Sequence, residues 1–132
     1  MQKLDKKRHF IIGTQTYKQD ILVCFNMTNK EALTVLKRKN KDTTREDEEY
    51  LLNDKPEHSV EGTLYPLSRG YLINMKWRKN SFRYNFCVAL HELTHASHYI
   101  LRNVRIPLNV ETEEAYTYLL EELAKQFLFK LY

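Results

Sequence analysis

Hydrophobic residues recur at intervals of three and four positions between residues 82 and 101, which predicts an amphipathic helix. Ser81 is a candidate N-cap for this helix. We expect the helix to end near Asn103, because Pro107 follows and a residue that precedes proline avoids helical geometry. The predicted buried stripe consists of Phe82, Phe86, Ala89, Leu90, Leu93, Ala96, Ser97, Ile100 and Leu101.

A second amphipathic helix is predicted for residues 110–132, after the break at Pro107. Because the connection between the two helices is short, we expect them to pack as antiparallel neighbours. The predicted buried side of the second helix consists of Ala115, Tyr116, Leu119, Leu120, Leu123, Phe127 and Leu131.

Four further segments have the composition of β-strands. Residues 9–17 and 20–27 form a first pair, in which the continuous apolar run from Ile21 to Phe25 predicts a central strand. Residues 61–67 and 70–77 form a second pair around a turn, where Gly70 can adopt a positive φ. Pro66 predicts that its strand either lies at a sheet edge or ends there.

Residues 28–39 are predicted to form a helix that begins with a capping box, since Thr28 is followed three residues later by Glu31. Its last residues, Lys37-Arg38-Lys39, are cations suited to a helix C-terminus. Residues 40–49 are charged and have no apolar periodicity, so we expect a loop that passes into a short helical turn near residues 50–52. We expect the acidic residues 46–49 to form a solvated face.

Together these segments predict an α+β fold with a mixed or antiparallel sheet of three to four strands and a C-terminal antiparallel helix. The length of 132 residues favours one domain over residues 1–132, long enough to bury a real core. The hydrophobic content of 42% and the charged content of 29% are ordinary for a globular protein.

Charge and cysteine content indicate the kind of partner and the cellular compartment of the protein. The net charge of +4 and the pI near 9.0 favour encounter with acidic partners without identifying one. Cys24 and Cys87 fit neither a disulfide framework nor a zinc ribbon, which indicates reduced thiols. The apolar runs are too short for a signal peptide or a membrane span. We therefore expect a cytoplasmic protein that is neither secreted nor bound to a membrane.

His91, Glu92 and His95 form the pattern His-Glu-x-x-His in the middle of the first predicted helix, and the two histidines lie off its apolar stripe. Histidines at i and i+4 lie one above the other on a helix, so both imidazoles can bind one metal ion. The carboxylate of Glu92 is then placed beside them, where it can act as a general base. The alternative is a surface helix that carries its histidines, including His98, without any metal.

A catalytic zinc ion uses three protein ligands and a water molecule, so the two histidines need a third partner. His98 lies seven residues after the first histidine, about 10 Å along the helix axis, which makes it a strained choice. We favour Glu114, because antiparallel packing brings the next helix near and the small Ala115 permits close approach. Glu111 and Glu113 are alternatives, although acidic residues are common in first helical turns for dipole reasons alone.

Residues 62–123 resemble the zincin metallopeptidases of the gluzincin type, and more closely the small zincin-like peptidase domains encoded in phages and prophages. The resemblance implies a zincin-like fold in which His91, His95 and Glu114 bind zinc. It further implies that Glu92 is the general base in the hydrolysis of a peptide or protein substrate by a zinc-activated water. The matching features are a Gly-Thr-Leu strand from Gly62, a second strand that ends at Met75, the motif His91-Glu-Leu-Thr-His95, and Glu114-Ala115-Tyr116.

The competing interpretation is a binding or assembly module on a zincin-like scaffold, without catalysis. Two basic segments favour this reading: Lys76-Trp77-Arg78-Lys79 with Phe82 and Arg83, and residues 37–41. A basic surface interleaved with aromatic residues would contact nucleic acid or an acidic protein partner. For the peptidase, in contrast, we expect an extended substrate to pair with an exposed strand edge in residues 70–77.

Overall fold

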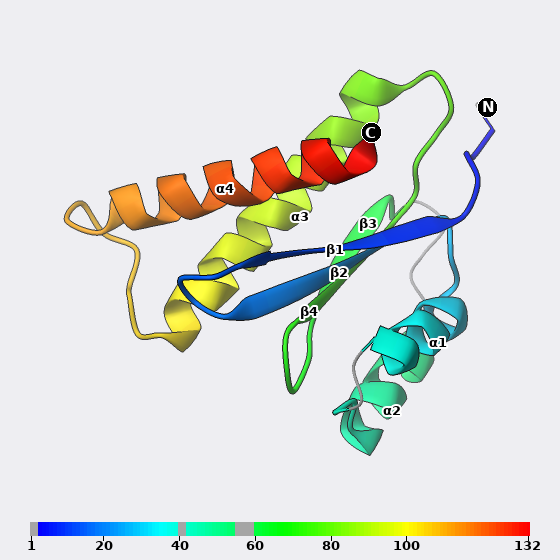
Figure 1. Cartoon of the computed structure of the whole chain (residues 1–132), viewed down its shortest axis with the longest axis horizontal. Helices are drawn as coiled ribbons and strands as arrows, with labels where there is room; N and C mark the ends of the chain where they lie inside the picture. The colour runs from blue at the N-terminus through cyan, green and yellow to red at the C-terminus, as the bar shows by residue number, and fades with distance from the viewer. Residues whose placement is uncertain (1–2, 40–41, 55–59) are drawn as a thin grey trace.

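The fold is built on a four-stranded mixed sheet with helices on both faces, as the computed structural model shows for residues 3–39, 42–54 and 60–132 (Figure 1). The strands are β1 (Arg8–Thr14), β2 (Gln19–Phe25), β3 (Gly62–Pro66) and β4 (Tyr71–Met75), in the spatial order β1-β2-β4-β3. β2 and β4 are parallel, whereas β1 pairs with β2 and β3 pairs with β4 in antiparallel orientation. The predicted α+β class and mixed sheet are confirmed.

Different pairs of helices cover the two faces of the sheet. α3 (Phe82–Asn103) and α4 (Glu113–Leu131) lie on one face, and α1 (Asn29–Lys39) and α2 (Arg45–Asn53) lie on the other (Figure 1). Successive residues of β2 alternate between the two sides, since Val23 packs toward α3 and α4 while Leu22 and Cys24 pack toward α1 and α2. Burial on both faces explains the continuous apolar run, and the predicted central position of β2 is confirmed.

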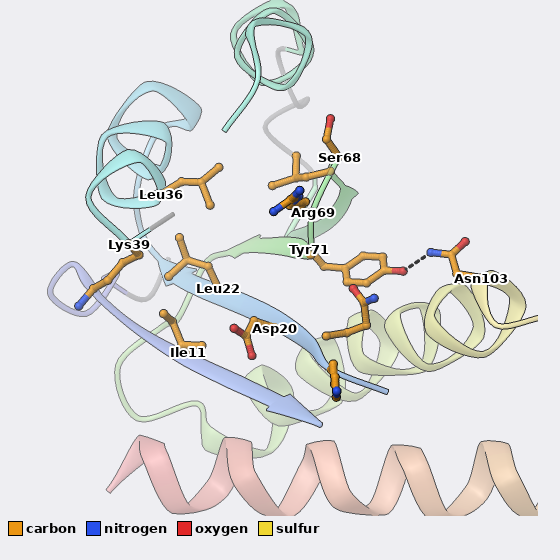
Figure 2. A pocket seen from close by; sticks show the side chains of 13 residues that line it. Ile11, Asp20, Leu22, Leu36, Lys39, Ser68, Arg69, Tyr71 and Asn103 are labelled. Atoms are coloured by element: carbon orange, nitrogen blue, oxygen red, sulfur yellow. Dashed lines mark hydrogen bonds between the residues drawn. The ribbon is translucent and has the colours of Figure 1, made fainter. Parts of the chain in front are cut away.

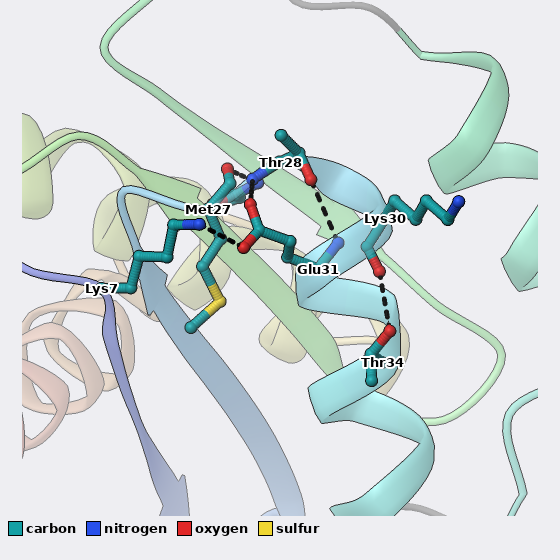
Figure 3. A network of polar contacts seen from close by, with 7 residues as sticks. Lys7, Met27, Thr28, Lys30, Glu31 and Thr34 are labelled. Carbon is teal, nitrogen blue, oxygen red and sulfur yellow. Dashed lines mark hydrogen bonds and ion pairs between the residues drawn. The ribbon is translucent and has the colours of Figure 1, made fainter.

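α1 begins with the capping box that its sequence predicts. The Thr28 hydroxyl accepts a hydrogen bond from the Glu31 N–H at 3.2 Å, and the Glu31 carboxylate accepts one from the Thr28 N–H at 3.1 Å (Figure 3). Lys7 forms an ion pair with the same carboxylate. The segment ahead of β1 is therefore connected to the start of α1.

The acidic segment forms a helix, which corrects the expectation of a loop as far as residue 49. α2 begins at Arg45 behind a second capping box, in which Thr44 and Asp47 bond to each other's backbone N–H groups. Asp47 is buried, and it also accepts hydrogen bonds from the N–H and the hydroxyl of Ser68 in the turn between β3 and β4. It does not lie on the solvated face that we expected. Residues 40–41 lie outside the described residues.

β3 and β4 form the predicted hairpin, and its turn contains Gly70 at a φ of +82°. The expectation of an exposed edge in residues 70–77 is wrong, because β4 is flanked by β2 and β3. Among the described strands, the free edges belong to β1 and β3. Pro66 is the last residue of β3, as predicted, so the edge strand ends where a backbone donor is missing.

α3 and α4 are the long antiparallel helices that the periodicity predicts. The end of α4 returns to the start of α3, where the ring centroids of Phe82 and Tyr132 lie 6.3 Å apart (Figure 1). α4 begins at Glu113 rather than at residue 110, because the Asn109 side chain accepts two backbone N–H groups in a turn just before it. None of the described helices is both long enough and apolar enough to cross a membrane.

Candidate metal centre

The buried face of α3 differs from the predicted stripe, because it includes the polar residues Asn85 and Glu92, and because Phe82 is exposed. The Asn85 side chain donates to the carbonyl of Arg78 at 2.8 Å and accepts from its N–H at 3.1 Å. This pair of hydrogen bonds ties the first turn of α3 to the segment that leaves β4. The helix that carries the motif is therefore held at its start by side-chain contacts as well as by the apolar core.

His91 and His95 are exposed on α3, and their side chains point toward one another. The two Nε2 atoms lie 3.2 Å apart, and the ring centroids are separated by 4.8 Å with an interplanar angle of 79°. A tetrahedral zinc ion with Zn–N distances of about 2.05 Å requires ligand nitrogens about 3.3 Å apart. The spacing of the two imidazoles therefore fits two positions of such a coordination shell.

Glu92 is the buried member of the motif, with an exposed fraction of 5%. Its Oε2 atom is buried and has no hydrogen-bond partner among the described residues. Burial raises the pKa of the Glu92 carboxyl, and the charges of His91 and His95 oppose that rise. A buried polar atom without a partner costs about 1–3 kcal/mol, so it calls for an explanation in terms of function.

Gly62 in β3 allows the free edge of the sheet to lie against this part of α3. A Cβ atom at Gly62 would lie 3.1 Å from Cγ1 of Val88 and 3.3 Å from Cγ of Glu92, closer than ordinary contact. The strand can approach the motif because this residue has no side chain. Sequence reasoning used Gly62 only as part of a strand, although a glycine inside a strand signals a close backbone approach.

The structure brings together three side chains of the motif that could hold a metal ion, His91, Glu92 and His95, with their potential ligand atoms within 4.8 Å of one another. No acidic residue of α4 joins this group in the described part of the chain. Glu114 is exposed in the first turn of α4, so its predicted role as a third ligand stays a prediction. Glu111 and Glu113 are exposed as well.

His98 and Cys87 both lie outside the gathered group. The ring of His98 is half-buried and packs edge-on against Tyr116, with 5.2 Å between centroids. Because α4 runs antiparallel to α3, this contact places the early residues of α4 beside the late residues of α3. Cys87, one turn before His91, is exposed.

Two cavities lie elsewhere in the molecule, and neither is lined by His91 or His95. One of about 730 Å³ lies near the start of α1. The other, of about 500 Å³, lies at the turn end of the sheet, where the Asn103 side chain donates to the Tyr71 hydroxyl at 2.7 Å (Figure 2). His91 and His95 are both exposed and lie outside these two cavities.

The two predicted basic segments do not form one surface. Lys39 lines the cavity shown in Figure 2 together with Gly70, at the beginning of β4. Lys79, in contrast, follows the end of β4. Trp77 has an exposed fraction of only 9%, so it belongs to the core and is not a surface aromatic residue, contrary to our expectation.

Comparison of the chain with protein-family models, with curated proteins and with solved structures found no match. The resemblance to zincin peptidases stays a prediction, and the chemistry of the site must be argued from its geometry.

Proposed function

We propose that this protein is a zinc-dependent peptidase of the zincin type, in which His91 and His95 bind the metal and Glu92 is the general base. One observation carries the proposal. The two exposed Nε2 atoms lie 3.2 Å apart beside the buried carboxyl of Glu92, and one oxygen of that carboxyl has no partner among the described residues.

The donor set fits zinc in both chemistry and spacing. Imidazole nitrogens and a carboxylate oxygen are the ligands of catalytic zinc sites, which keep one position open for water or substrate. When bound, zinc supplies a Lewis acid that lowers the pKa of water and polarises a carbonyl group. Glu114 is our proposed third ligand, and its exposed side chain forms no ion pair within the described residues.

Glu92 can hold and pass on a proton at Oε2. Burial shields this oxygen from solvent, and no protein donor among the described residues occupies it. A carboxylate in such a position can accept a proton from the attacking water and return it to the leaving amine. Glu92 and the two histidines belong to one helix. The helix therefore fixes the position of the carboxyl relative to the two imidazoles and to a metal ion that they would bind.

The free edge of β3 supports a peptide as the substrate. Among the described strands β3 pairs only with β4, so its outer backbone groups can accept an extended chain as an added strand. Gly62 brings this edge next to Glu92. A peptide bound there would be held close to the two histidines. We therefore propose β3, in place of residues 70–77, as the strand edge at which the peptide docks.

We infer that the protein acts in a reducing compartment, the cytoplasm. Cys24 and Cys87 are both free, and Cys24 is buried in the core, where it has no second thiol to pair with in the described residues.

Metal content and hydrolysis test the proposal together. We expect the purified protein to carry about one zinc per chain by inductively coupled plasma mass spectrometry, and His95→Ala to lose it. Glu92→Gln should keep the metal while hydrolysis of a fluorogenic peptide library falls by about 10²- to 10⁴-fold. Glu114→Gln should weaken zinc retention if Glu114 is the third ligand.

His98→Ala is the matched control, because it removes a histidine of the same helix that lies outside the gathered group. It should keep both the zinc and the activity. The proposal is wrong if wild-type protein binds no zinc, or if Glu92→Gln hydrolyses peptides at the wild-type rate.

A further inference from the structure

Two basic segments that are more than 70 residues apart in the sequence lie side by side at one end of the molecule. The N–H of Lys79 donates to the carbonyl of Lys3 at 3.0 Å, and Leu4 forms an isolated β-bridge with Arg78. The segment before β1, the start of α3 and the end of α4 all lie at this end of the molecule (Figure 1). The fold thus combines cations that no local sequence pattern connects.

Five exposed cations form what we call the basic face: Lys3, Lys6, Lys79, Arg83 and Lys130. Within the described residues, none of the five forms an ion pair with an acidic side chain. Lys130 lies near the N-terminal segment, because the end of α4 contacts the start of β1. There the Arg8 side chain donates a hydrogen bond to the carbonyl of Leu131 at 2.8 Å.

The nearest acid in sequence does not neutralise the basic face. The Asp5 carboxylate accepts a hydrogen bond from the backbone N–H of Lys6 at 2.8 Å, and its single negative charge offsets only one of the five positive charges. Glu31 and Glu61 are paired with Lys7 and Arg78, which are not part of the face. The five cations therefore give this end of the molecule a positive potential that extends into solvent.

Exposed aromatic residues neighbour two of these cations in the sequence. Phe82 and Tyr84 flank Arg83 and have exposed fractions of 41% and 52%, and Phe129, next to Lys130, has one of 82%. Phe82 is held flat against Phe86, with 5.7 Å between ring centroids and an interplanar angle of 6°. The stacking fixes the orientation of the Phe82 ring while part of it stays exposed.

We propose that the basic face binds single-stranded nucleic acid. Cations that lack acidic partners attract the phosphate backbone, and exposed aromatic rings can stack on bases that are not paired. A duplex hides its bases from such rings, whereas a single strand presents both its phosphates and its unpaired bases, so the single strand can use both the cations and the rings. Arg83 precedes His91 by eight residues, about 12 Å along α3, so this surface is separate from the metal centre.

Fluorescence anisotropy with a labelled 20-nucleotide oligo(dT) tests the proposal at 50 and 200 mM salt. We expect binding that weakens steeply with salt. Lys79→Ala/Arg83→Ala should weaken binding at least tenfold at 50 mM salt and lower the slope of log K against log salt by about 1.4, since each lost phosphate contact contributes about 0.7. Tyr84→Ala/Phe129→Ala should weaken binding about tenfold with little change in the slope.

Arg38→Ala/Lys39→Ala is the matched control, because it removes the same charge at the end of α1, away from the basic face. The proposal fails if oligo(dT) does not bind at 50 mM salt, or if this control weakens binding as much as Lys79→Ala/Arg83→Ala. It also fails if polyglutamate or a duplex of equal charge competes as well as the single strand, which would indicate an acidic protein or a duplex as the partner.

His95→Ala keeps this test independent of the proposed peptidase. The variant should bind oligo(dT) as the wild type does even though it has lost zinc. Thermal unfolding of every variant checks that a loss of binding does not come from a loss of fold.

Discussion

Cys24 is the last residue but one of β2 and has no exposed surface, and burial raises the pKa of its thiol to about 12, from an ordinary value of 9.0. Burial disfavours the thiolate in the folded protein, whereas in the unfolded chain the thiol can lose its proton at its ordinary pKa. Above pH 9 the folded state therefore holds more protons than the unfolded state, and the free energy of unfolding falls as pH rises.

We expect the free energy of unfolding of the wild type to decrease between pH 8 and pH 10 by about 1.4 kcal/mol more than that of Cys24→Ala. Urea unfolding at both pH values measures the difference. The cavity left by the substitution lowers stability at both pH values and cancels in this comparison. Cys87→Ala, at an exposed position, should keep the wild-type pH dependence, and a parallel decrease in all three proteins would contradict the assignment.

At the scale of elements, α2 is connected to the β3–β4 hairpin through one carboxylate. Asp47 accepts from the N–H of Thr44 at 3.2 Å with one oxygen, and from the N–H and hydroxyl of Ser68 at 2.9 and 3.0 Å with the other. The side chain is buried. It therefore caps the helix and fixes the turn at the same time.

Asp47→Ala should lower the free energy of unfolding by about 2–3 kcal/mol, because it removes a helix cap and leaves the partly buried donors of Thr44 and Ser68 without their acceptor. Glu46→Ala removes the neighbouring, exposed acid and should change stability by less than about 0.5 kcal/mol. Chemical denaturation of both variants and the wild type measures these changes in the free energy of unfolding. Equal effects would show that Asp47 acts only through its charge in the first turn of α2.

At the scale of the whole molecule, Asn26 joins three parts of the chain that meet at the end of the sheet. Its side-chain amide donates to the carbonyls of Asp5 at 2.8 Å and Trp77 at 3.1 Å, and its Oδ1 accepts from the N–H of Trp77 at 2.7 Å. Its backbone has a φ of +61°, which asparagine tolerates better than most residues. The N-terminal segment and the path from β4 to α3 are thus held by one residue.

Asn26→Ala should lower the free energy of unfolding by about 2–4 kcal/mol and increase hydrogen exchange at the backbone N–H of Asp5, which donates to Trp77. Asn80→Ala is the matched control, because Asn80 also has a positive φ, of 57°, but the structure gives its side chain no bond of this kind. The control should cost less and leave the exchange at Asp5 unchanged. If Asn26→Ala leaves that exchange slow, the N-terminal segment is held by other contacts.

The sequence alone determined the features that depend on neighbours along the chain. The periodicity of residues 82–101 predicts α3, the apolar run of β2 predicts its central place, and Thr28 with Glu31 predicts the start of α1. The proximity of His91 and His95 belongs to the same class, because a helix places positions i and i+4 together whatever surrounds it.

Only the tertiary structure decided the features that depend on residues far apart in the sequence. Glu92 is buried because Gly62 lets β3 approach α3, and Asp47 is buried because the Ser68 turn packs over it. The order of the strands made β3 the free edge near the motif, and Lys3 reached Lys79 through the same packing. Periodicity and spacing report what a segment forms; they do not report which other segment lies against it, because that choice is made by the burial of the whole core.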